Sequence, residues 1–115
     1  RDLRAEHVLF DAGRVTGVVD YGAMAPDSPA VDLARLLGDL AGTAAALFAA
    51  GLDAYRAAGG PLDAPGPFVR VLADTGSVCA LLGWLVRLVG RREPVARPGA
   101  VAARVEELLA RVEAA

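Results

Sequence analysis

The stretch that decides the fold is Arg1–Gly22, RDLRAEHVLFDAGRVTGVVDYG. It reads as a loop, a short strand at 7–10, a tight turn at 11–14, a second short strand at 15–19 and another loop. The strand residues are mostly Val, Leu and Phe, which is typical of strands that are at least half-buried. Gly13 can supply the positive φ that tight hairpin turns need, and Gly17 is expected to mark a bulge or a close backbone approach. The stretch therefore predicts a β-hairpin.

A hairpin would bring together residues that are far apart in the sequence. Pairing back from the turn places Phe10 opposite Val15, His7 opposite Val18 and Ala5 opposite Asp20. Asp2, His7 and Asp20 would then gather at one corner of the molecule. Carboxylate oxygens are the hard ligands that Mg²⁺ prefers, so this corner is a candidate magnesium and phosphate site.

Two motifs in this stretch resemble those of the protein-kinase-like phosphotransferases. Residues 1–7, RDLRAEH, resemble the kinase catalytic loop H-R-D-L-x-x-x-N from its second letter onward. Asp20-Tyr21-Gly22 resembles the D-F-G motif that supplies a magnesium ligand. The segment that follows, with Pro26 and then Asp32-Leu33-Ala34, is similar to the small-molecule kinases of the aminoglycoside phosphotransferase, choline kinase and homoserine kinase group, which continue from a D-L-A as helices.

The resemblance implies a role for each motif residue. Asp2 would be the catalytic base for a substrate hydroxyl, and Asp20 would hold Mg²⁺. Arg4 would offset charge on the transferred phosphoryl group, although a surface arginine is an equally good interpretation. Asp32 lies where a negative charge favours a helix start, and in the family it also braces the catalytic loop through hydrogen bonds.

One departure from the motif concerns His7, which stands where the family has the metal-binding Asn. Imidazole nitrogen suits zinc, copper or iron better than magnesium. His7 would therefore ligate the metal weakly, bind a phosphate or orient Asp2. It also keeps an alternative open, in which the chain is a catalytically inactive pseudokinase lobe or a helical binding scaffold.

Composition bounds what these 115 residues can do alone. All twelve basic residues are Arg, so the chain lacks the lysine that contacts ATP phosphates in kinases. The hydrophobic share of 55% and the mean hydropathy of +0.41 are high for a free-standing domain. This apolar content suggests a face that packs against something outside this chain. The kinase resemblance implies that this is the amino-terminal lobe of the same protein, so we expect a carboxy-terminal lobe fragment. By itself the fragment is expected to be inactive, with Mg²⁺, ATP and a small-molecule hydroxyl substrate as its ligands in the whole enzyme.

Charge and cysteine content exclude other classes of function. A net charge of −2 and a pI near 5.3 argue against nucleic-acid binding. Cys79 is the only cysteine, so no internal disulfide can form, and one Cys with one His makes no structural zinc site. The apolar runs at 40–52 and 78–89 are too short to span a membrane. The single cysteine is typical of a cytoplasmic protein. Lys, Asn, Gln and Ile are absent, and because Lys, Asn and Ile share A/T-rich codons we expect a GC-rich, bacterial source.

The predicted fold class is α+β and mostly helical, namely a protein-kinase-like carboxy-terminal lobe. Residues 1–27 would hold the catalytic loop, the hairpin and the metal-binding loop, and residues 28–115 a helical subdomain. That subdomain would be a bundle of about four helices, at 29–40 (capped by Ser28), 44–58 (capped by Thr43 and ended by Gly59-Gly60), 68–90 and 99–115. The third helix is expected to be central, with Trp84 in the core, and Glu107 and Arg111 should pair on the outside of the fourth.

The substrate is left open among aminoglycosides, choline and homoserine-like alcohols.

Overall fold

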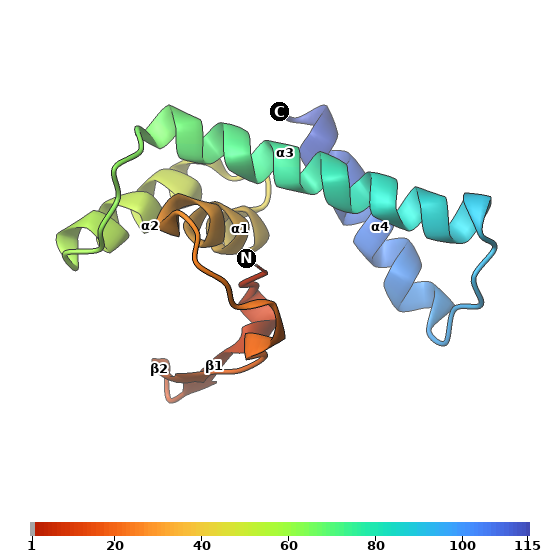
Figure 1. Cartoon of the computed structure of the whole chain (residues 1–115), viewed down its shortest axis with the longest axis horizontal. Helices are drawn as coiled ribbons and strands as arrows, with labels where there is room; N and C mark the ends of the chain where they lie inside the picture. The colour runs from red at the N-terminus through yellow and green to blue at the C-terminus, as the bar shows by residue number, and fades with distance from the viewer. Residues whose placement is uncertain (1) are drawn as a thin grey trace. The chain divides into compact units, whose positions relative to one another are not determined.

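The structure, a computed structural model, describes residues 2–115 and is mostly helical with one small antiparallel sheet (Figure 1). This confirms the predicted α+β class. The elements are η1 (Ala5–His7), β1 (Val8–Asp11), β2 (Arg14–Val18), η2 (Tyr21–Ala23), α1 (Pro29–Ala41), α2 (Ala45–Ala57), α3 (Gly66–Leu85), η3 (Val86–Gly90) and α4 (Pro98–Glu113). The chain divides into two compact units; the first ends at Ala73 and the second begins at Asp74.

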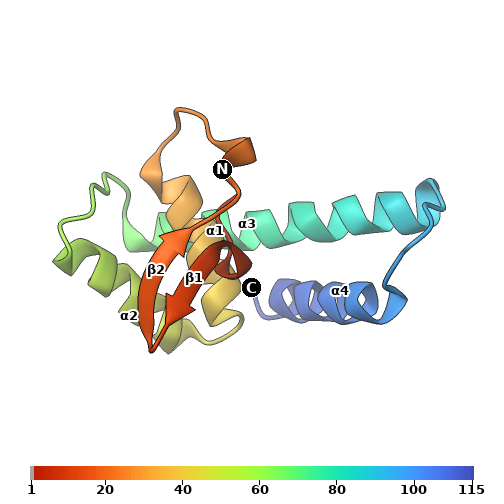
Figure 2. The same ribbon diagram turned by 90° about the horizontal axis from the view of Figure 1, so that it is seen from below.

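The hairpin of the first unit turns through two residues, Ala12 and Gly13, between paired Asp11 and Arg14 (Figure 2). Both turn residues have positive φ, 45° for Ala12 and 76° for Gly13. Positive φ at both central positions is the mark of a type I′ turn, whose twist matches that of the two strands. The predicted turn at 11–14 is therefore confirmed.

The register of the hairpin differs by one residue from the prediction. Phe10 pairs with Val15 as expected, but Leu9 pairs with Gly17, so Thr16 is an extra residue in a β-bulge. The Thr16 hydroxyl donates a hydrogen bond to the Leu9 carbonyl across the bulge, 3.3 Å away. The predicted bulge near Gly17 is thus present, and it makes the simple pairing of His7 with Val18 wrong.

Beyond the bulge, Val8 pairs with Val18, and the Val19 N–H donates to the His7 carbonyl over 2.9 Å. The expectation that Ala5 would lie opposite Asp20 on a strand is also wrong, because Ala5 begins the 3₁₀ turn η1. The strands are also more exposed than predicted; Phe10 and Val15 are 60% and 61% exposed.

Helix α1 begins as the sequence predicts. The Ser28 hydroxyl accepts a hydrogen bond from the Ala30 N–H at 3.3 Å, and Pro29 occupies the first turn, where its missing N–H costs nothing. Such a cap is worth about 1 kcal/mol to a helix. Asp32 lies in the same first turn, where the helix dipole favours its charge.

The core of the first unit lies between α1, α2 and the start of α3. The buried residues of α1 recur at helical spacing and form one apolar face. The core residues are Ala30, Leu33, Ala34, Leu37, Ala41, Phe48, Leu52, Val69 and Ala73. Small residues let the helices approach closely; a Cβ on Gly38 would lie 3.2 Å from that of Ala73, and one on Gly51 would collide with Leu37.

Helix α2 starts one residue later than predicted, because Ala44 rather than Thr43 is its N-cap and no side chain caps it. Its C-terminus follows the predicted glycine signal. Gly59 has a φ of 75° and donates to the Arg56 carbonyl at 2.9 Å, while the Gly60 N–H donates to the Tyr55 carbonyl at 3.0 Å. These two bonds form a Schellman motif, which satisfies carbonyls left over at the helix end.

Helix α3 departs from the prediction of a buried central helix. Leu82 and Val86 are 55% and 52% exposed, and Trp84 is half-buried rather than core, with the Arg87 guanidinium 4.7 Å from its ring centre. The helix continues through a π-helical turn, η3.

The helical segment Gly66–Gly90 is long and apolar enough to cross a membrane by length and composition alone. Of its most apolar stretch, 17% is buried. A single helix of this kind is weak evidence for a membrane span.

Helix α4 buries one face, on which Leu108 is only 1% exposed. Glu107 and Arg111 form the predicted ion pair one turn apart. Glu107 lies on the outside as expected, with 47% of its side chain exposed, but Arg111 is 7% exposed, so the expectation is wrong for Arg111. The long arginine stem is buried while its guanidinium reaches Glu107, as amphipathic side chains commonly do.

Candidate functional site

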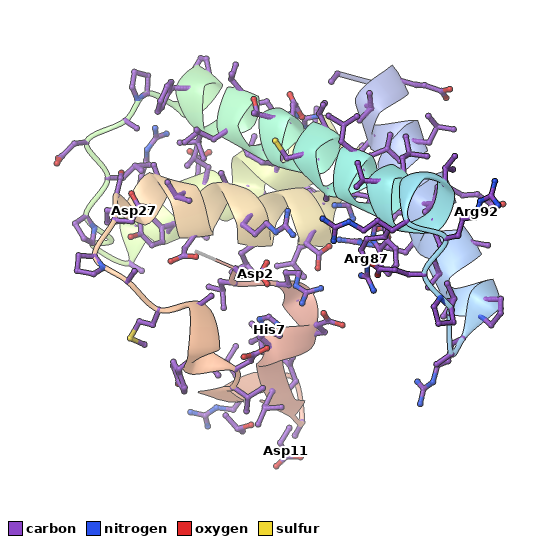
Figure 3. All side chains as sticks on the ribbon, turned by 45° about the vertical axis from the view of Figure 1, so that its right-hand side comes forward. Asp2, His7, Asp11, Asp27, Arg87 and Arg92 are labelled. Atoms are coloured by element: carbon purple, nitrogen blue, oxygen red, sulfur yellow. The ribbon has the colours of Figure 1, made fainter. Side chains whose placement is uncertain are left out.

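The loop at 2–7, the end of β2 with the residues after it, and the first turn of α1 enclose a pocket of about 200 Å³. Asp2, His7, Asp20 and Asp32 all line it, and its other walls are mainly apolar. The predicted gathering of Asp2, His7 and Asp20 at one corner is therefore confirmed. Figure 3 shows Asp2 beside α1 and His7 on the turn that precedes the hairpin.

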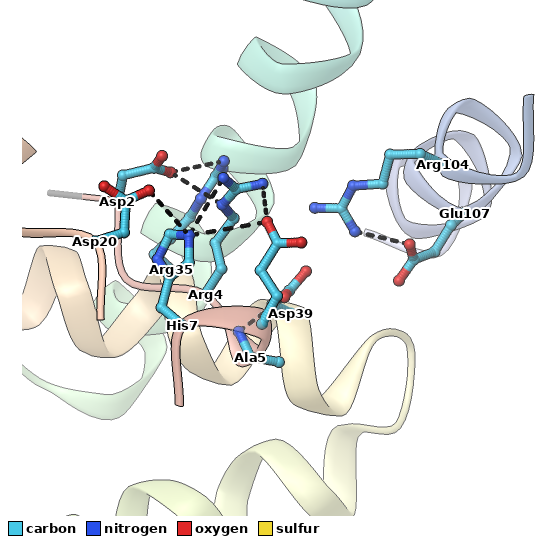
Figure 4. A network of polar contacts seen from close by, with 10 residues as sticks. Asp2, Arg4, Ala5, His7, Asp20, Arg35, Asp39, Arg104 and Glu107 are labelled. Atoms are coloured by element: carbon cyan, nitrogen blue, oxygen red, sulfur yellow. Dashed lines mark hydrogen bonds and ion pairs between the residues drawn. The ribbon is translucent and has the colours of Figure 1, made fainter. Parts of the chain in front are cut away.

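The Asp2 carboxylate lies between two guanidinium groups. Its Oδ1 atom is 3.3 Å from Arg35 Nη2 and 3.6 Å from Arg4 Nε (Figure 4). Both arginine side chains are roughly 70% buried, since 28% and 30% of their surfaces are exposed. Partial burial weakens screening by solvent, so these two cations restrict the position of the carboxylate more than surface ion pairs would.

Arg4 also contacts the turn that follows it. Its Nη1 atom is 2.6 Å from Glu6 Oε1, and its Nη2 atom is 3.4 Å from the Nε2 atom of His7. The cation predicted to meet a phosphoryl group is thus already engaged by side chains on both sides. To contact a phosphate, Arg4 would have to exchange the exposed Glu6 carboxylate for the incoming anion.

His7 is buried, with 6% of its surface exposed. Its Nε2 atom lies 3.6 Å from Asp20 Oδ2 and 3.8 Å from Glu6 Oε1, in addition to the Arg4 contact. The imidazole therefore joins the two sides of the site, the 2–7 loop and the segment after β2. Its contacts explain how a histidine is accommodated there, because Nε2 faces polar partners rather than the apolar core.

Asp20 follows β2 immediately and adopts a left-handed conformation with φ 64° and ψ 65°. Asp and Asn tolerate this region better than other non-glycine residues. The turn it creates leads into η2 and leaves the carboxylate 63% exposed at the pocket. Ala12 and Arg92 also have positive φ, so the place of Asp20 on the pocket, rather than its backbone conformation, makes it a candidate site residue.

Helix α1 holds the 2–7 loop from one side. Asp32 Oδ1 accepts a hydrogen bond from the Leu3 N–H at 3.4 Å, which confirms the predicted bracing by this carboxylate. Asp39 Oδ2 accepts a second from the Ala5 N–H at 3.0 Å. The sequence reasoning missed Asp39 and Arg35, although their spacing from Asp32 puts all three charges on one face of a helix.

The donor set of the pocket suits magnesium better than a transition metal. Among residues 2–115, no three His, Cys, Asp or Glu side chains are grouped so that they could hold a metal ion. Mg²⁺ seldom uses such a cage, since it takes one or two carboxylates and completes its shell with water and substrate phosphates. The exposed Asp20 carboxylate on this pocket fits that pattern, whereas an imidazole nitrogen such as that of His7 is a poorer magnesium ligand.

Comparison with protein families identifies the family to which the chain belongs. The sequence model of the phosphotransferase enzyme family matches residues 1–65. Because the match covers more than half of the 115 residues, the chain belongs to this family, and its relationship is to the aminoglycoside phosphotransferase-like proteins. The matched range contains Asp2, Arg4, His7 and Asp20 together with α1 and α2. No curated protein and no solved structure matches the chain.

Proposed function

We propose that the chain is the catalytic-loop-bearing lobe of an ATP-dependent kinase that phosphorylates a hydroxyl group of a small molecule. The supporting observation is that Asp2 and Asp20 line one pocket, within the range matched by the phosphotransferase family. An aminoglycoside, choline or a homoserine-like alcohol would be the acceptor. The reaction moves the γ-phosphoryl group of ATP to the acceptor oxygen, with ADP as the second product.

In this proposal, Asp2 accepts a hydrogen bond from the substrate hydroxyl and receives its proton as the O–P bond forms. Arg35 and Arg4 keep the Asp2 carboxylate in position, 3.3 and 3.6 Å from its Oδ1 atom. Asp20 would hold Mg²⁺, whose charge offsets that of the phosphate oxygens. Arg4 would approach the phosphoryl group after releasing Glu6, and His7 would orient Asp20 rather than bind the metal.

The remaining contacts to ATP would come from an amino-terminal lobe of the same protein, in a protein-kinase-like arrangement. The chain itself contains no Lys, so it cannot supply the lysine that kinases use on the ATP phosphates. Residues 1–27 would serve catalysis and metal binding, and 28–115 would form the helical part of the lobe. A cytoplasmic location is part of the same proposal.

The test is phosphotransfer by the full-length protein with ATP, Mg²⁺ and a panel of aminoglycosides, choline and homoserine. Asp2→Asn and Asp20→Asn should each lower kcat by about 10²–10⁴-fold. Asp53→Asn is the matched control, because Asp53 is an exposed helical aspartate in a surface ion pair with Arg56. Full turnover by Asp2→Asn would overturn the proposed role of Asp2, and thermal melts of each variant exclude loss of folded protein.

A second candidate, a lobe that binds partners without catalysis, is favoured by one contact. His7 stands at the motif's Asn position, and its Nε2 atom faces Asp20 Oδ2 at 3.6 Å, where it would compete with a metal for this carboxylate. This candidate predicts no Mg²⁺-dependent nucleotide binding by the full-length protein. It also predicts that His7→Asn and Asp20→Asn leave every measured property except stability unchanged.

A further inference from the structure

Helix α1 has two faces with different partners. One face carries Leu33, Leu37 and three alanines into the core against α2 and α3. The other carries Asp32, Arg35 and Asp39, which are half-buried and recur at intervals of three and four residues. Each of these three contacts the 2–7 loop, at Leu3, Asp2 and Ala5 respectively. The loop is thus attached to the side of a helix whose other side is fixed in the core.

Asp39 supplies a hydrogen-bond acceptor that the 2–7 loop itself lacks. Turn η1 begins at Ala5, and its N-cap residue, Arg4, supplies no side-chain hydrogen bond to the turn. The first N–H groups of any helical turn need an acceptor from outside the turn. Asp39 provides one at 3.0 Å for Ala5, from 34 residues away in the sequence. Turn η1 carries His7 and directly follows Asp2 to Arg4. The bond from Ala5 to Asp39 therefore fixes the position of this turn relative to α1.

The contact of Arg35 acts on the carboxylate itself. Its Nη2 atom lies 3.3 Å from Asp2 Oδ1, closer than the 3.6 Å of Arg4 Nε. Arg4 moves with the loop, whereas Arg35 is held by a core helix. The Arg35 contact therefore ties the Asp2 side chain to a rigid element, and the Asp39 contact ties the backbone beside it.

We propose that Arg35 and Asp39 are positioning residues for phosphoryl transfer. Arg35 fixes the direction of the Asp2 carboxylate, and Asp39 fixes the turn that carries His7. This inference rests on the proposed function of Asp2 as the base. Neither side chain touches the reacting atoms; they act by holding groups that do, since a displacement of about 1 Å at a reacting group can cost 10²-fold in rate.

The experiment compares Arg35→Met, Asp39→Leu and Asp39→Asn in the full-length protein with MgATP and the acceptor that the wild type phosphorylates. Arg35→Met and Asp39→Leu should lower kcat by about 10–100-fold and change the KM for MgATP by less than about threefold. Asp39→Asn should retain most of kcat, because its amide oxygen can accept the same Ala5 N–H. The controls are Arg56→Met and Asp53→Leu on α2, which should match the wild type.

A second readout is independent of activity. Amide hydrogen exchange at Ala5 and His7 should accelerate in Asp39→Leu and remain slow in Asp39→Asn and Asp53→Leu. Wild-type kcat in Arg35→Met and Asp39→Leu would overturn the inference while leaving the proposed function intact. A wild type without phosphotransfer would overturn the proposed function, and unchanged exchange at Ala5 in Asp39→Leu would separately overturn the bracing of the turn.

Discussion

His7 Nε2 lies 3.6 Å from Asp20 Oδ2, although thirteen positions separate the two residues in the sequence. The bulge at Thr16 sets this contact. It moves the pairing by one residue, so that Val19 rather than Val18 bonds to the His7 backbone and Asp20 follows directly. The left-handed turn at Asp20 then directs its carboxylate to the pocket that His7 also lines.

His7→Asn should increase Mg²⁺-dependent phosphotransfer by the full-length protein, by about tenfold at limiting Mg²⁺. The reason is that an amide oxygen can join Asp20 at the metal, whereas imidazole nitrogen suits magnesium poorly. Turnover against Mg²⁺ concentration is the measurement, with Asp20→Asn as the matched variant that loses the response while keeping a residue that tolerates positive φ. Absence of turnover in all three proteins at every Mg²⁺ concentration would support the non-catalytic candidate.

Ala12→Asn should stabilise the chain by about 1 kcal/mol. Ala12 has a φ of 45°, which costs an alanine about 1–2 kcal/mol, whereas Asn relieves part of that cost in a type I′ turn. Urea unfolding followed by circular dichroism measures the change. Gly13→Ala, at a φ of 76°, should shift stability by a similar amount in the opposite direction; a shift of the same sign in both variants would argue against this turn.

Gly51→Ala and Gly83→Ala should have opposite effects. Both glycines lie inside helices, where alanine is normally favoured by about 0.5–1 kcal/mol. A Cβ at Gly83 meets no atom within 4 Å, so that gain is expected in full. A Cβ at Gly51 would collide with Leu37, which is 7% exposed in the core, so overpacking should destabilise by about 1–3 kcal/mol. Thermal or urea unfolding of the two variants decides the sign of each.

Glu93 should titrate below its ordinary range, because the hydrogen bond from Arg87, 2.7 Å away, stabilises the carboxylate and lowers its pKa from 4.5. A pKa lowered by folding adds stability above the unfolded value of about 4.5, and that stability is lost as pH falls through the lower folded pKa. Carboxyl chemical shifts measured against pH should show the pKa of Glu93 rising in Arg87→Ala. Arg91→Ala should raise it less, because Arg91 contributes less to the shift.

Local signals in the sequence predicted much of the fold. The turn at Ala12-Gly13, the Ser28 cap and the Gly59 helix end are each determined by residues within a few positions, and all three are confirmed. The register of the hairpin was missed by one residue, because a bulge depends on contacts across the strands, such as that between Thr16 and Leu9. Periodicity also failed for α3, where an all-round apolar pattern predicted burial and the structure leaves Leu82 and Val86 exposed.

The residues of the candidate site also fall into those that the sequence predicted and those that it did not. Asp2, His7 and Asp20 were predicted to meet because they lie at the open end of one hairpin, and they do share a pocket. Asp39 and Arg35 could not be singled out from composition or motif, since charged residues on a helix usually face solvent. Their partners in the 2–7 loop are set by how α1 lies against it, which depends on tertiary packing rather than on spacing along the chain.

Helix α1 links the stability of the core and the position of the 2–7 loop in one element. A change in the core such as Leu33→Val removes packing beneath α1, and any shift of the helix that follows would be passed to the 2–7 loop that its other face holds. Substitutions in this core are therefore expected to change the position of the 2–7 loop together with the stability of the fold, so the two properties cannot be altered independently.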